Sequence, residues 1–108
     1  MEIPEGFVKL VRADAVNEGQ PVTAFAGIKR FVVYRVDESI HCTQNLCPHA
    51  GAHLGRGELR GNVIICPRHQ WGFDITTGEC LTDGTYDIRV YPTHLADDGY
   101  VYAKVATE

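Results

Sequence analysis

A chain of 108 residues has room for one domain, which at this size buries roughly two-thirds of the surface of the unfolded chain. Hydrophobic residues make up 44% of the chain and charged residues 22%, proportions that exclude a disordered or fibrous protein. The formal net charge is -4 and the ten Lys and Arg are scattered along the sequence, which argues against a nucleic-acid partner.

Strand patterns dominate the sequence, and no segment has the 3.6-residue period of a long amphipathic helix. One helical turn is predicted at residues 12–16, and the glycine-bearing stretch that begins at residue 47 predicts a structured loop. We predict an all-β antiparallel fold in a single domain, 1–108. Its strands, in chain order, are expected at 21–26, 30–36, 40–43, 58–60, 63–65, 71–75, 79–81, 86–91 and 100–105.

The sequence has no basic start followed by an apolar run, and no stretch approaches the ~20 apolar residues of a membrane span. We therefore expect a cytoplasmic protein that does not enter a membrane. Four cysteines would suit a secreted two-disulfide scaffold only if an export signal were present. Metal binding is accordingly the first interpretation of the cysteines, which lie at positions 42, 47, 66 and 80.

Two short motifs each combine a thiol with an imidazole: Cys47-Pro48-His49 and Cys66-Pro67-Arg68-His69. Proline restricts the backbone inside each motif and favours a tight turn. A hairpin at Gly61-Asn62 would fold the chain back between the motifs, so that both turns project from one tip of a sheet. The pattern predicts a metal site with the ligands Cys47, His49, Cys66 and His69.

Two kinds of metal centre fit this donor set. One tetrahedral zinc ion would make the site a structural staple and the protein a zinc-stapled binding module. Zinc fingers of the ββα kind, however, pair Cys with Cys and His with His, whereas each turn here mixes the two ligand types. In a Rieske centre two His replace two Cys on one iron, so each turn can give its Cys to one iron and its His to the other.

The segment from Cys47 to Asp74 resembles the Rieske iron-sulfur family, and the length and strand order of the chain are similar to those of the small Rieske ferredoxins of aromatic-ring dioxygenases. The resemblance implies a Rieske-like β-sandwich with a small cluster-binding subdomain, about residues 42–75, made of two loops at one tip. It implies one [2Fe-2S] cluster, with Cys47 and Cys66 on the inner iron and His49 and His69 on the outer iron.

The function implied by this resemblance is that of a monomeric electron carrier, not an enzyme, which takes single electrons from a flavin-dependent ferredoxin reductase and passes them to a terminal oxygenase. The alternative is a small Rieske subunit of a reductase such as a nitrite reductase. The cluster motif does not name the donor, the acceptor or the substrate of the partner oxygenase.

The sequence departs from the high-potential members of the family. Those proteins carry a disulfide between the cluster loops, which would fall at Ala52 and Arg68, and hydroxyl donors to the cluster sulfurs, which would fall at Trp71 and Phe73. Fewer hydrogen bonds to sulfur leave the electron-rich reduced state less stabilised. We therefore expect a potential at the low end of the Rieske range.

Other candidate ligands have simpler interpretations. Cys42 and Cys80 are predicted to be small buried residues, although a disulfide between them is an alternative. His53 lies four residues beyond His49, and the family spacing selects His49 as the ligand. Trp71 fits either the core or a docking face near the cluster.

Overall fold

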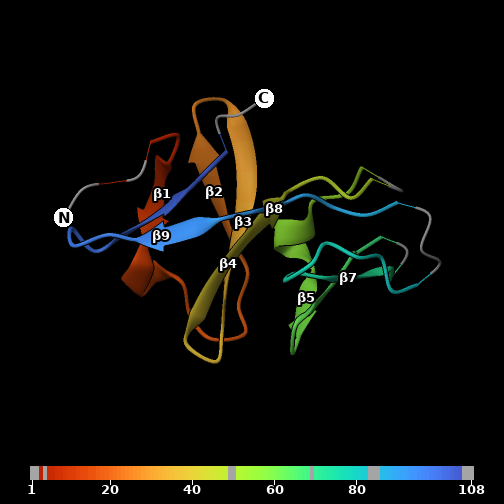
Figure 1. The fold of residues 1–108 in the computed structure, drawn as a ribbon. Coiled ribbons are helices and arrows are strands. Elements are labelled where there is room, and N and C mark those ends of the chain that lie inside the picture. Colours follow the sequence, from red (N-terminus) through yellow and green to blue (C-terminus); the bar gives the residue numbers. More distant parts are fainter. Residues whose placement is uncertain (1–2, 4, 49–50, 69, 83–85, 106–108) are drawn as a thin grey trace.

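The computed structural model describes residues 3, 5–48, 51–68, 70–82 and 86–105, and its strands form three antiparallel sheets (Figure 1). The all-β prediction is confirmed. The first sheet has the order β1-β10-β9, with β1 at Val8–Arg12, β10 at Tyr100–Ala103 and β9 at Thr93–Leu95. The second has the order β2-β3-β4-β8, with bounds Val22–Ala26, Lys29–Val36, Ser39–Gln44 and Val90–Tyr91. The third has the order β5-β6-β7, with bounds Glu58–Arg60, Val63–Ile65 and Gly72–Asp74.

Strand β3 is the centre of the molecule because both of its faces are buried. Successive side chains of a strand point to opposite faces. Val32 and Tyr34 accordingly enter one apolar core, while Phe31 and Val33 enter another. Tyr34 keeps its phenol inside by hydrogen bonding to Thr43 Oγ1 of the neighbouring strand at 2.8 Å. The second sheet, β2-β3-β4-β8, therefore separates two cores, and we call it the middle sheet.

The two cores join the middle sheet to different partners. Val101 and Ala103 of β10 share one core with Phe31 and Val33, which completes a β-sandwich. The other core holds Ile64 and Phe73 of the third sheet, β5-β6-β7, which we call the small sheet. This core also contains Cys47 and Cys66. In Figure 1 the small sheet accordingly lies on one side of β3 and β4, and β1 and β9 lie on the other.

The predicted strands differ from the observed ones at four places. Strands β1 and β9 were not predicted, and residues 79–81 contribute only an isolated bridge, Phe73 to Cys80. The predicted strand 86–91 is reduced to Val90–Tyr91, which pair with β4. The residues that precede Val90 form other hydrogen bonds instead. The Ile88 N–H donates to the Gly78 carbonyl, and Asp87 Oδ1 accepts a hydrogen bond from the Cys80 N–H.

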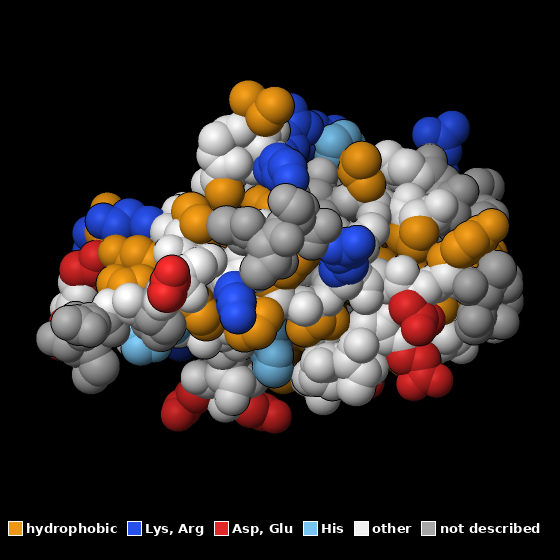
Figure 2. Space-filling view, turned by 45° about the horizontal axis from the view of Figure 1, so that its top comes forward, with side chains coloured by type: hydrophobic (Ala, Val, Ile, Leu, Met, Phe, Trp, Pro, Cys, Tyr) orange, Lys and Arg blue, Asp and Glu red, His pale blue; other side chains and the backbone are white. Residues whose placement is uncertain are grey.

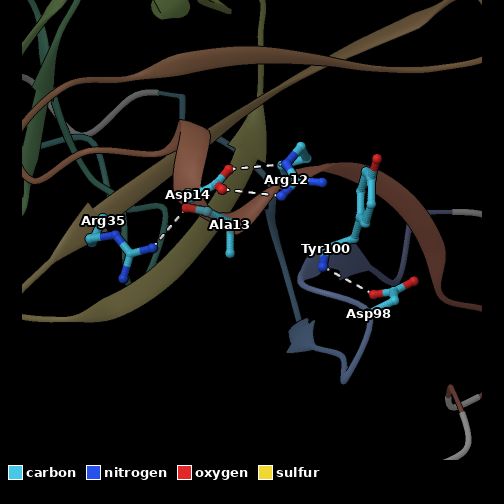
Figure 3. A network of polar contacts seen from close by, with 6 residues as sticks. All are labelled: Arg12, Ala13, Asp14, Arg35, Asp98 and Tyr100. Carbon is cyan, nitrogen blue, oxygen red and sulfur yellow. Dashed lines mark hydrogen bonds and ion pairs between the residues drawn. The ribbon is translucent and has the colours of Figure 1, made fainter.

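The predicted helical turn is present as a 3-10 helix, η1, at Ala13–Ala15. Arg35 of β3 holds it from the side, since its Nε donates to the Val16 carbonyl (2.7 Å) and its Nη2 to the Ala13 carbonyl (2.8 Å; Figure 3). The neighbouring Arg12 instead pairs with Asp14 at the surface. No helix in the described part of the chain has the length and apolar character that crossing a membrane requires.

An Arg35→Met variant is expected to lower the free energy of unfolding by about 2 kcal/mol, because two charged hydrogen bonds to partly buried carbonyls are lost while the aliphatic stem is kept. The thermal midpoint measures this. Arg60→Met is the control, since Arg60 forms an exposed ion pair with Glu58 and such pairs contribute little. Equal midpoints for the two variants would contradict the role assigned to Arg35.

Candidate metal centre

Cys47 begins a tight loop three residues after the end of β4. Its N–H donates to the Ala52 carbonyl at 2.8 Å, and its carbonyl accepts from the Gly51 N–H at 2.7 Å. These two bonds close the loop at its base. The four enclosed residues, 48–51, include His49, which lies outside the described residues.

Cys66 begins a second loop of the same form after β6. Its N–H donates to the Trp71 carbonyl at 2.7 Å, and its carbonyl accepts from the Gln70 N–H at 3.0 Å. The enclosed residues, 67–70, include His69, which is likewise outside the described part of the chain. The two predicted ligand turns are thus built alike, with a cysteine at the start of each.

The two loops also share a backbone conformation at their last enclosed residue. Gly51 has φ 68° and Gln70 has φ 62°. A residue in the left-handed region is the usual way to end a four-residue loop between paired strand ends. Glycine adopts this conformation freely, whereas glutamine does so with some strain. The close match between the loops supports the pairing that the sequence motifs predicted.

Both cysteines lie in the same apolar core. Cys47 is 2% exposed and Cys66 is fully buried, and Leu54, Ile64 and Phe73 of this core are buried with them. The structure therefore brings two sulfur donors from two loops into one water-excluded region, which fits a group bound through thiolates. Among the described residues no three Cys, His, Asp or Glu side chains gather as a metal site, and two of the four predicted ligands are not among them.

The remaining cysteines have the buried positions that were predicted. Cys42 belongs to the sandwich core on the other side of the middle sheet, and burial raises the pKa of its thiol to about 12. Such a thiol is protonated and unreactive at neutral pH. Cys80 lies in the core that holds Cys47 and Cys66. None of the four cysteines forms a disulfide, so the alternative of a bridge from Cys42 to Cys80 is wrong.

A buried asparagine, which the sequence interpretation missed, supports the first loop. Asn45 is 3% exposed, and its side-chain amide donates to His53 Nδ1 at 2.7 Å. Its backbone carbonyl accepts from the Leu54 N–H at 2.6 Å. His53 is therefore occupied in holding the loop, as expected of a histidine that is not a ligand. An Asn nine residues before the η2 turn, Leu54–Arg56, carries no motif by itself.

Two glycines fix the loop against its neighbours. A Cβ at Gly55 would collide with Thr23 Oγ1 of β2, and one at Gly57 would collide with the Ile65 carbonyl oxygen beside Cys66. These approaches place η2 between the middle sheet and the small sheet. A hollow of about 630 Å³ remains between the two loops, and Ala52 and Arg68 both line it. These are the two positions at which the resemblance places the disulfide of high-potential Rieske proteins.

Comparisons with known proteins agree with this geometry. A family model described as the Rieske [2Fe-2S] domain matches residues 6–92. The ferredoxin component of the naphthalene 1,2-dioxygenase/salicylate 5-hydroxylase systems of a Ralstonia species is 40% identical over 83 residues, which cover 76% of this chain and 80% of that protein.

Solved structures agree as well. The ferredoxin of Sphingomonas yanoikuyae B1 is 34% identical, covers 89% of this chain and 95% of its own, and superposes with a TM-score of 0.82. A chain from a complex of reduced oxygenase and oxidised ferredoxin in carbazole 1,9a-dioxygenase is 28% identical, with a TM-score of 0.81 and coverage of 93% and 94%. With two matching cysteine loops, one shared buried core and these relatives, the chain belongs to the Rieske [2Fe-2S] domain family.

Proposed function

We propose that this chain carries one [2Fe-2S] cluster on Cys47, His49, Cys66 and His69, and that it transfers single electrons from a flavin-dependent reductase to a terminal oxygenase. The burial of Cys47 and Cys66 in one core, at the bases of two loops of the same form, is the observation that carries the proposal. Relatives that are ferredoxin components of dioxygenase systems, and a neighbour in complex with an oxygenase, support the assignment of partners.

When bound, the cluster supplies a one-electron couple whose potential is raised by replacing two thiolates with neutral imidazoles. The chain's own residues exclude water from the sulfur side of the site, because Leu54, Ile64 and Phe73 are fully buried around the two cysteines. The opposite side is the tip of the two loops. A carrier of this kind needs an exposed edge for electron exchange and no substrate pocket.

The low-potential assignment rests on the side chains after the second loop. Phe73 is fully buried and Trp71 packs against the same core, so neither position offers a hydroxyl to a sulfur atom. A redox titration is expected to give a midpoint near the lower end of the Rieske range, roughly -150 mV. A midpoint well above 0 mV would show that other donors stabilise the reduced state.

A His53→Ala variant is expected to keep the visible spectrum of the iron-sulfur protein unchanged. The imidazole of His53 bonds to Asn45, so its loss removes one buried hydrogen bond at a cost of about 1 kcal/mol, without removing a ligand. His49→Ala is the matched variant and is expected to bleach the protein. If His53→Ala bleached it and His49→Ala did not, the ligand assignment in the first loop would be wrong.

The function is tested by mixing the reduced protein with an oxidised terminal oxygenase under anaerobic conditions. Transfer of one electron per chain, seen as reoxidation of its visible spectrum, is the expected result. The alternative recipient, a nitrite reductase, has less support, because the relatives named as dioxygenase ferredoxins are more similar than those named as nitrite reductases. Electron transfer to a nitrite reductase but to no oxygenase would overturn the proposal.

A further inference from the structure

Two hollows beside the cysteine loops join into one surface, because His53 lines both. The first lies between the loops and is lined by Arg56 and Arg68. The second, of about 570 Å³, runs from His53 to the β2–β3 turn and is lined by Lys29 and Arg30. We call the region defined by these four cations, with Ile28 and Leu46 between them, the basic surface.

The basic surface has one sign of charge. All four cations are exposed, none forms an ion pair within the described ranges, and no described Asp or Glu lines either hollow. The chain as a whole carries fourteen Asp and Glu against ten Lys and Arg. Positive charge is therefore concentrated on this surface although the net charge of the chain is negative. It creates a local electrostatic field that attracts an anionic partner.

Exposed apolar side chains lie between these charges. Ile28 is 97% exposed at the β2–β3 turn, and Leu46, which immediately precedes Cys47, is 51% exposed. The turn is at the top of Figure 1, and Lys and Arg, histidine and hydrophobic side chains gather along the upper part of Figure 2, with acidic side chains lower down. An apolar centre with a charged rim is the usual composition of a protein docking site.

The basic surface is held in shape by contacts between its segments. Leu46 and His53 form an isolated antiparallel bridge, and the Gln44 side chain donates to the Leu46 carbonyl at 2.7 Å. Gly55, beside Arg56, packs directly against Thr23 of β2. A surface fixed in this way loses little conformational entropy when a partner binds.

We infer that the terminal oxygenase docks on the basic surface, and that the oxygenase presents carboxylates around an apolar contact there. This inference rests on the proposed function and adds to it the charge and extent of the contact. The surface includes the hollow between the two ligand loops and Arg68 of the second loop, so a partner docked there lies against the loop side of the site, the side assigned above to electron exchange. A second copy of this chain is disfavoured as the occupant, because two such surfaces would bring four cations against four.

The test compares Arg56→Glu/Arg68→Glu with Arg60→Glu/Lys104→Glu, which changes the net charge equally outside the basic surface. The terminal oxygenase of the Ralstonia naphthalene system serves as the electron acceptor in stopped-flow mixing with reduced protein. We expect the bimolecular rate constant to fall about tenfold or more at low salt in the first variant and less than twofold in the second. The difference is expected to vanish at about 1 M salt, where charges are screened within a few ångströms.

Lys29→Glu/Arg30→Glu is a second test pair, distant in sequence from the ligand motifs, and serves if the first variant loses its chromophore. Equal rates for test and control variants, or faster transfer in the test variants, would overturn the inference. So would a slower reaction with the reductase alone, or a dimer that the substitutions dissociate. If unmodified protein passes no electron to the oxygenase at any salt concentration, the proposed function itself fails, which is a different result.

Discussion

A Cys66→Ser variant is expected to purify without iron, falling from about two iron atoms per chain to nearly none. Serine keeps the size of the side chain but replaces the soft thiolate with a hydroxyl that binds iron weakly. Because Cys66 is fully buried beside Cys47, no exposed side chain can replace it without rebuilding the core. Iron analysis and the visible spectrum measure the loss.

The chain offers two matched controls for this substitution. Cys42→Ser changes a residue that is equally buried but lies in the sandwich core. Cys80→Ser changes a residue in the same core as Cys66 but outside the two motifs. Both are expected to keep iron, with some loss of stability from a buried hydroxyl. If Cys80→Ser lost iron and Cys66→Ser retained it, the assignment of Cys66 as the second sulfur ligand would be wrong.

The Gly78→Ala substitution is expected to destabilise the protein more than Gly99→Ala, which serves as its control. Gly78 has φ 86°, its N–H donates to Asp74, and its carbonyl accepts from Ile88 at 2.8 Å. A Cβ would also collide with the Ile88 carbonyl oxygen. The left-handed conformation costs about 1–2 kcal/mol, and displacing packed backbone adds about 1–3 kcal/mol.

Gly99→Ala separates these two costs. Gly99 has nearly the same φ, 83°, but no atom lies within 4 Å of the added carbon. At about 4 °C per kcal/mol for a domain of this size, the thermal midpoint is expected to fall by roughly 12 °C for Gly78→Ala and roughly 4 °C for Gly99→Ala. If the two variants lost the same number of degrees in thermal midpoint, measured at the same heating rate, the backbone around Ile88 would move aside without a cost in stability.

Strand pairs that are neighbours in the sequence were predictable. The strand-forming residues of β2 and β3 flank a glycine turn, so composition and turn agree. Strand β1 was missed because it pairs with Tyr100–Ala103, far away in the sequence, and changes register between Lys9 and Val11. Such a pairing depends on tertiary contacts that no local pattern records.

The candidate site likewise has one part that the sequence predicted and another that only the folded chain shows. The motifs predicted Cys47 and Cys66 as sulfur ligands because ligand type and spacing are local properties of the sequence, and the structure places both in one core. The support from Asn45 to His53 and the contact between Gly55 and Thr23 required the folded chain. The basic surface was equally hidden, since it combines cations that lie far apart in the sequence. Scattered charges in a sequence therefore do not exclude a concentrated charge on the surface.

Analysis of iron, zinc and acid-labile sulfide in anaerobically purified protein, combined with an EPR spectrum of the reduced form, shows which metal the two loops hold. We expect a brown protein with about two irons and two sulfides per chain, and an EPR signal that appears on reduction. A colourless protein with one zinc and no sulfide would contradict it, and would make the two loops a structural zinc site.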